Sequence, residues 1–153
     1  MLAAPVTEEA PLIVFRSDDG KAAMVRLLPG TDLLTGLNEA AKELGFEAAT
    51  LQLLGAVRTL SVAYFDQETR RYQPHSYTGG LEISGGVGNV SLKDGEPFVH
   101  MHLSGWAKEE GRAIAGHLIE GTEVYMIEAY YRVFEGPAPV RELDEEVGLP
   151  VWH

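Results

Sequence analysis

The sequence predicts an α+β domain in which a mainly antiparallel β-sheet packs with one principal helix. Apolar runs with strand character dominate the chain, and a single segment shows helical spacing of its apolar residues. The connections between these runs are short and rich in Gly and Asp. Parallel strands would need repeated helical crossovers of a dozen or more residues, so an antiparallel sheet is expected.

A β-hairpin is expected at the start of the fold. Residues 11–15 and 22–28 form two apolar runs. The sequence Ser-Asp-Asp-Gly at 17–20 lies between them and is a strong turn signal. The two runs are therefore expected to pair as neighbouring strands.

The principal helix is expected after this hairpin. Thr31 or Asp32 can cap its first turn, and Gly45 stands where helices commonly end. Between these limits the apolar residues fall at helical spacing; they are Leu33, Leu34, Leu37, Ala40, Ala41 and Leu44.

Strand signals dominate the rest of the chain. Residues 107–115 could form a short helix or an ordered loop, and the tail from Glu135 onward contains Pro137, Pro139 and Pro150. Gly85-Gly86-Val87-Gly88 does not open a helix, which favours a bulge or tight turn over a phosphate-binding loop.

No repeat or linker divides the sequence, so residues 1–153 are expected to form a single domain. The expected strands cover residues 48–54, 58–65, 72–77, 81–92, 97–103 and 122–134.

Composition restricts both partners and chemistry. Twelve Lys and Arg stand against 23 Asp and Glu, and the formal net charge of −11 disfavours binding to a phosphate backbone. The chain has no Cys, so disulfides, thiolate nucleophiles and Cys-based zinc sites are excluded, and any metal must be held by His or carboxylates. Neither a secretory signal nor an apolar stretch of roughly 20 residues is evident, so a cytoplasmic protein without membrane contact is expected.

The histidines are the most informative residues. His100 and His102 would project side by side, because residues i and i+2 of a strand point to the same face. Their imidazoles could converge on one ion, with His117 as the third ligand. The alternative is a pair of half-buried polar residues that bond to backbone or water without any metal. His75 and His153 are expected at the surface.

Several motifs resemble those of the PPC (plants and prokaryotes conserved) domain family. The most specific are FVHMHLS at 98–104 and AGHLIEGTEV at 115–124. Weaker similarities follow in the same order as in the family, and the resemblance covers roughly residues 12–149. These are LPGTDL at 28–33, LEI at 81–83, GNVS at 88–91, and the spacing of Arg141, Asp144, Gly148 and Leu149.

The resemblance implies an α+β fold with a central antiparallel sheet, assembled as a homotrimer. It also implies a divalent metal, expected to be zinc, on His100, His102 and His117. The family fold is similar to that of acetolactate decarboxylase and of a small zinc-dependent ester hydrolase family, which hold zinc on three histidines. In plants the domain follows a basic AT-hook, but this sequence contains no Arg-Gly-Arg core.

Three functions from different classes follow from these patterns. The first is a trimeric metal-binding domain that acts through contacts with a protein partner. The second is a zinc-dependent enzyme that acts on a small carbonyl or ester substrate, with Glu123 and Glu128 as candidate acid/base residues. Arg58 and Arg112 could orient an acidic substrate in that case. The third is a DNA-associated regulator, which the acidic charge disfavours, so direct DNA binding by this domain alone is not expected.

Overall fold

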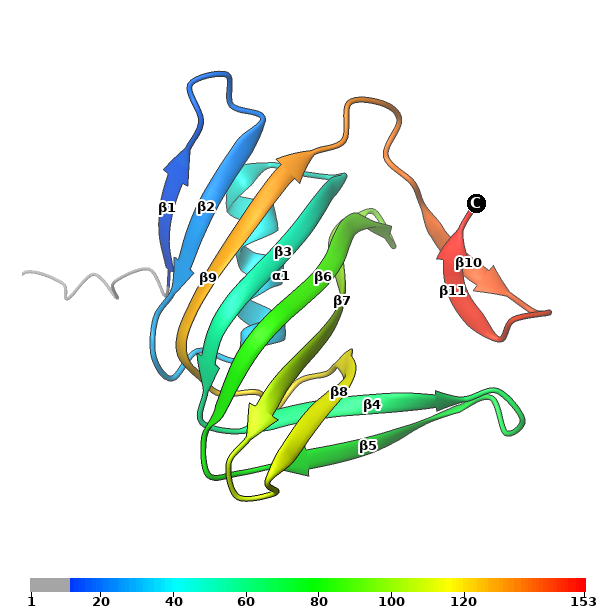
Figure 1. Ribbon diagram of the computed structural model, residues 1–153. Helices are drawn as coiled ribbons and strands as arrows, with labels where there is room; N and C mark the ends of the chain where they lie inside the picture. Colours follow the sequence, from blue (N-terminus) through cyan, green and yellow to red (C-terminus); the bar gives the residue numbers. More distant parts are fainter. Residues whose placement is uncertain (1–11) are drawn as a thin grey trace, which may run out of the picture.

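A nine-stranded antiparallel sheet forms most of the structure, a computed structural model that describes residues 12–153 (Figure 1). Its strand order is β1-β2-β9-β3-β6-β7-β8-β4-β5, and β10 and β11 form a separate two-stranded sheet. The α+β prediction with a mainly antiparallel sheet is therefore confirmed. The strands are β1 (Leu12–Arg16), β2 (Ala22–Leu27), β3 (Ala49–Val57), β4 (Leu60–Asp66), β5 (Arg71–Tyr77), β6 (Leu81–Lys93), β7 (Glu96–Ala107), β8 (Arg112–Leu118), β9 (Val124–Val133), β10 (Arg141–Asp144) and β11 (Leu149–Trp152).

The expected first hairpin is formed by β1 and β2. The Ser17 hydroxyl accepts a hydrogen bond from the Ala22 amide at 2.9 Å, and the Lys21 amide donates to Asp19 Oδ1 at 3.0 Å. Ser and Asp side chains stabilise such turns by bonding to backbone amides a few residues away. Pro11, the first residue of the expected strand, lies outside the described residues.

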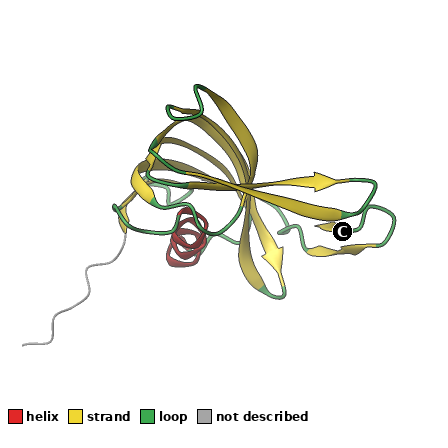
Figure 2. Cartoon of the chain, turned by 90° about the horizontal axis from the view of Figure 1, so that it is seen from below, coloured by secondary structure: helices red, strands yellow, loops and turns green. Residues whose placement is uncertain are grey.

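Within the described residues a single helix, α1 (Leu33–Leu44), covers one face of the sheet (Figure 2). Asp32 is the N-cap, because its Oδ1 accepts a hydrogen bond from the Thr35 amide at 2.9 Å. Gly45 adopts the left-handed conformation with φ 72°, which ends the helix. The buried Tyr131 hydroxyl of β9 donates to the Leu37 carbonyl at 2.9 Å and joins helix to sheet.

The opposite face of the sheet carries both exposed apolar residues and the histidines. Directly paired residues form one row that crosses all nine strands of this sheet in the described chain. Because paired residues of a sheet project to the same side, the apolar surface and the histidines share one face. The row is Phe15, Met24, Tyr130, Gln52, Val87, His102, His117, Ala63 and Pro74.

One expectation about the chain after residue 103 was wrong. Residues 107–115 form neither a helix nor a loop, because β7 ends at Ala107, a turn follows, and β8 begins at Arg112. Gly111, with φ 63°, allows this turn to reverse the chain. The tail forms the β10–β11 hairpin, in which Pro150 pairs with Leu143 in a sheet of two edge strands, where a missing amide is tolerated.

The β4–β5 and β10–β11 hairpins extend to the same side of the molecule (Figures 1 and 2). Their turns meet, because Arg70 Nη1 donates to the Glu145 carbonyl at 2.8 Å. The segment that leads into β10 is hydrogen-bonded to β6, since the Leu92 amide donates to the Pro139 carbonyl at 2.9 Å. The expected bulge is also present, as the β6–β7 register shifts between Ile83 and Gly85. No helix among residues 12–153 is long and apolar enough to cross a membrane.

Candidate metal centre

Strands β7 and β8 bring three histidines together. Val99, Met101 and Leu103 of β7 are buried on the helix side, so His100 and His102 project from the other face. His117 of β8 pairs directly with His102 across the strands.

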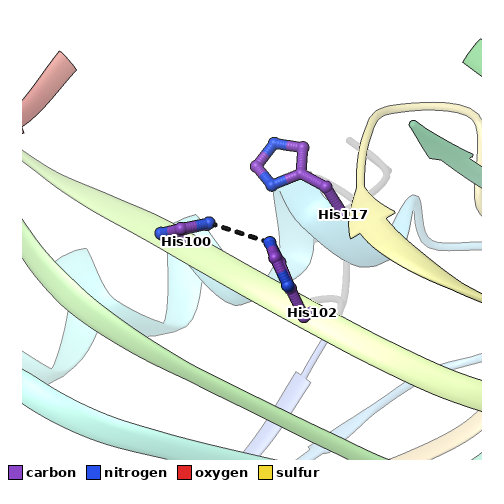
Figure 3. Close-up of side chains that lie close together, drawn as sticks. All are labelled: His100, His102 and His117. Atoms are coloured by element: carbon purple, nitrogen blue, oxygen red, sulfur yellow. Dashed lines mark hydrogen bonds between the residues drawn. The ribbon is translucent and has the colours of Figure 1, made fainter. Parts of the chain in front are cut away.

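The three side chains point toward one another (Figure 3). His100 Nε2 lies 3.2 Å from His102 Nε2. The ring centroid of His117 lies 5.0 Å from that of His100 and 5.5 Å from that of His102. One nitrogen of each ring lies within 4.8 Å of one nitrogen of each of the others. The three histidines therefore lie around one point, as expected from the i, i+2 spacing of His100 and His102 with His117 as the third residue.

The geometry of these nitrogens fits a metal ion. Imidazole nitrogens at about 2.0–2.1 Å from a tetrahedral zinc ion lie about 3.3 Å apart, close to the His100–His102 separation. His117 Nδ1 is buried and has no hydrogen-bond partner among the described residues. An unpartnered buried nitrogen is costly, and a metal bond would satisfy it. The three histidines could therefore hold one ion.

The surroundings favour neutral imidazoles, which is the form that binds metals. Burial lowers the pKa of His100 to about 4, with further contributions from the positive charges of His117, Arg141 and His102. Burial also lowers the pKa of His117, helped by His102 and Arg141. The charges that act on these two rings include no carboxylate.

Arg141 of β10 lies against the outer nitrogen of His100. Its Nη2 is 3.4 Å from His100 Nδ1 and donates to Asn89 Oδ1 at 3.0 Å. Its Nε donates to Ser91 Oγ at 2.8 Å, and its Nη1 donates to the Pro150 carbonyl at 3.1 Å. The guanidinium also lies 5.5 Å from the ring centres of two aromatic residues, Phe98 and Trp152. Arg141 thus joins the β10–β11 hairpin to the histidine cluster.

The β4–β5 hairpin contacts the cluster from another side. The ring of Tyr72 stacks on that of His117 with centroids 4.9 Å apart and an interplanar angle of 24°. Phe65 packs against Tyr72 edge to face at 5.2 Å. These contacts fix the orientation of His117, whose ring would otherwise be free to rotate about its side-chain bonds.

A cleft of about 820 Å³ opens beside the histidines. The β4–β5 hairpin forms one wall with its aromatic residues, and Leu149 of β11 contributes from the tail. The lining contains no Asp or Glu. In addition to the three histidines, the residues that line the cleft include Tyr64, Phe65, Tyr72, Ser84, Val87, Leu103, Ser104, Ala115 and Leu149.

The structure does not bring the two candidate glutamates to this cleft. Glu123 binds Arg58 through an ion pair of 2.8 Å. Glu128 of β9 pairs with Arg26 of β2 and with a residue of β3, and strands β3 and β6 separate it from β7. Arg112 lies at the far end of β8, within 3.8 Å of Glu110, and like Arg58 it does not line the cleft.

No role was predicted from the sequence for Arg141, Asn89 or Tyr72. Arg141 and Asn89 both stand within the motifs that resemble the PPC family, and a polar residue in such a motif is a signal that could have identified them. Tyr72 carries no such signal, because its contact with His117 depends on how the β4–β5 hairpin lies against β8.

Comparison with known proteins shows similarity to one family. The chain matches the family described as the Plants and Prokaryotes Conserved (PCC) domain over residues 15–135. It is similar to a metal-containing protein from Archaeoglobus fulgidus, with 37% identity, coverage of 87% of this chain and 93% of that chain, and a TM-score of 0.82. It is also similar to a plant- and prokaryote-conserved protein from Pyrococcus horikoshii, with 33% identity, 97% coverage of both chains and a TM-score of 0.80.

A more distant structure shares the fold alone. It is a protein from Bacteroides thetaiotaomicron named for a suspected role in DNA binding, with 21% identity, coverage of 94% of this chain and 98% of that chain, and a TM-score of 0.85. No functionally curated protein matches the chain. The similarities therefore concern family and fold, and one relative is named for its metal.

Proposed function

The chain belongs to the Plants and Prokaryotes Conserved (PCC) domain family, and we propose that it is a homotrimeric domain that binds one zinc ion through His100, His102 and His117. The observation that carries this proposal is the meeting of three imidazoles, with two Nε2 atoms 3.2 Å apart and an unpartnered buried Nδ1 on the third. The Archaeoglobus relative named as metal-containing supports it.

Zinc is the ion that we propose because its ligand preferences agree with this site. Three neutral nitrogen ligands suit zinc better than calcium or magnesium, which prefer oxygen. A zinc ion with three protein ligands keeps an open position and can act as a Lewis acid. The protein's own part is to hold the rings in place, through Tyr72 on His117 and Arg141 on His100.

The exposed face of the sheet supports the proposal of a trimer. Phe15, Met24 and Val87 are 64%, 60% and 68% exposed and lie in the same cross-strand row as Tyr130. A sheet with one face on a helix and apolar residues on the other needs cover on that second face. We propose that a second copy of the chain supplies this cover, and a further protein partner could use the same face.

A zinc-dependent enzyme is the second candidate function. The cleft of about 820 Å³ beside the histidines has the size of a small-molecule site. Glu123 and Glu128 lie outside it, so the described residues offer no carboxylate there as a general base. Any reaction on a small carbonyl or ester would therefore depend on the metal and on the hydroxyl and imidazole groups of the cleft.

The test is the metal content of protein purified without a histidine tag and dialysed against zinc. We expect one zinc ion per chain, and His102→Ala should lower the content at least about tenfold, because a ligand is lost. His102 is exposed, so its replacement should leave the fold intact. His75→Ala, which changes an exposed histidine of β5, is the control and should keep the metal. Wild-type protein without zinc, or equal losses in both variants, would contradict the proposal.

A further inference from the structure

The histidine end of the cleft carries positive charge without negative compensation. No carboxylate among the described residues lies within ion-pair distance of Arg141, and none lines the cleft. Partial burial lowers the pKa of Arg141, and no Asp or Glu among the described residues offsets this effect. This positive charge at the histidine end of the cleft contrasts with the net charge of −11 of the whole chain. A divalent ion on three neutral imidazoles would add two more positive charges.

The position of Arg141 is fixed by its contacts. Its guanidinium donates to Asn89, Ser91 and the Pro150 carbonyl, and these partners are all neutral. Arg141 does not itself line the cleft, so it acts on the cleft across the His100 ring, to which it is 3.4 Å distant. A charge in such a partly buried place is weakly screened and attracts an anion to the open side of that ring.

The remainder of the cleft is apolar. Phe65 and Tyr72 of the β4–β5 hairpin project to the same face as His117, because Phe65 pairs with Tyr72 and lies two residues after Ala63, the partner of His117. Tyr72 is 42% exposed, and Leu149 of β11 adds a further apolar residue to the lining. Two hydroxyls, Ser84 Oγ and Ser104 Oγ, lie 3.4 Å apart and provide hydrogen-bond donors. An inorganic anion would leave this apolar wall without contacts, whereas a small organic molecule would cover it.

We propose that this cleft binds a small organic carboxylate, whose charged end faces the three histidines and whose apolar body lies against Phe65 and Tyr72. The inference rests on the proposed function, because the metal supplies most of the charge that selects an anion. It specifies the ligand of that site: a monocarboxylic acid with an aromatic or branched body.

The test uses cobalt-loaded protein, because the visible absorption of Co²⁺ reports changes at the site without any assay of activity. Phenylacetate should shift the cobalt bands and bind at least about tenfold more tightly than phenylacetamide, which has the same body without the charge. It should also bind more tightly than acetate or inorganic phosphate, which lack the apolar body. Equal affinity for acid and amide, or phosphate binding as tightly as phenylacetate, would overturn the inference.

Variants separate the two parts of the site. Phe65→Ala should weaken phenylacetate several-fold, while Tyr125→Ala, which removes an exposed aromatic ring (58%) outside the cleft, should not. Arg141→Gln should weaken phenylacetate and leave phenylacetamide unchanged. Because that change could loosen the β10–β11 hairpin, Arg141→Lys is added; it keeps the charge and should keep most of the preference for the acid.

The outcomes distinguish this inference from the function on which it rests. Protein that takes up one cobalt ion per chain but does not prefer the acid to the amide contradicts the carboxylate inference alone. Protein that binds neither zinc nor cobalt contradicts both. A Phe65→Ala variant that binds phenylacetate as tightly as wild type contradicts the placement of the apolar body.

Discussion

His102 and His117 are direct cross-strand partners in the β7–β8 pair. Side chains of such partners have Cβ atoms about 4.5–5.5 Å apart, so the pairing alone brings two imidazoles within reach of one ion. His100 joins them because it lies two residues before His102 on the same strand face. Three candidate ligands thus depend on one hairpin and its register, and a register shift of one residue would turn the ligands of the shifted strand to the other face.

The register of the neighbouring strand β6 is fixed by a glycine. A Cβ on Gly88 would overlap the carbonyl oxygen of His100, while a Cβ on Gly85 would meet nothing within 4 Å. We therefore predict that Gly88→Ala lowers the free energy of unfolding by about 1–3 kcal/mol and weakens metal binding, because β7 must move. Gly85→Ala is the matched control and should change neither. Urea unfolding and zinc titration measure both effects; equal stability of the two variants would contradict this account.

Acid should destabilise the metal-free protein through His100. Its pKa is about 4 in the folded state against 6.5 for an unperturbed histidine. Between these values the unfolded chain binds a proton that the folded chain does not, so stability falls as the pH is lowered from 6.5 toward 4. His117 acts in the same direction. His100→Gln should reduce the pH dependence of the urea midpoint in this window relative to the wild type. An unchanged slope in His100→Gln would show that His100 is readily protonated in the folded protein.

The apolar sheet face should mediate assembly. Light scattering at micromolar concentration should give about three times the chain mass of 16.7 kDa. Met24 lies between Phe15 and Tyr130 in the cross-strand row, so Met24→Asp should dissociate the trimer by placing a charge in the interface. Leu143→Asp, at an exposed apolar residue of β10, is the control. A monomeric wild type would contradict the trimer.

This domain alone should not bind DNA with submicromolar affinity. A trimer would carry 3 × −11 = −33 charges, which oppose the approach of a duplex. Titration of a labelled AT-rich duplex at about 50 mM salt is the most sensitive test, since binding to the phosphate backbone is strongest at low salt. Submicromolar binding that weakens steeply with added salt would show that folding gathers the scattered Lys and Arg into a basic patch.

The sequence was sufficient for the elements with local signals. The capping Asp32, the terminal Gly45 and the apolar spacing between them predicted α1 at its observed bounds. The i, i+2 spacing predicted that His100 and His102 share a face, and the resemblance to a known family supplied His117. The helix and the shared strand face are observed because each depends on residues close together in the chain, and the role of His117 as a third ligand stays a prediction.

The failures concern contacts between distant segments. Strand β8 was missed because Ile114 is one of only two buried apolar residues in a short strand, and charged residues precede it. The candidates Glu123 and Glu128 were placed by their position after His117, but the sheet inserts β9 between β2 and β3, away from β7. The contact between Arg141 and His100 joins residues 41 apart, and no local pattern encodes it.

We expect His100, His102 and His117 to bind one metal ion together. A crystal structure of the zinc-loaded protein, with anomalous diffraction data recorded on both sides of the zinc absorption edge, would locate this ion. We predict one anomalous peak per chain, at about 2.0–2.1 Å from one nitrogen of each of the three imidazoles. No peak at this position, or well-ordered imidazoles turned away from one another in the presence of zinc, would contradict the claim.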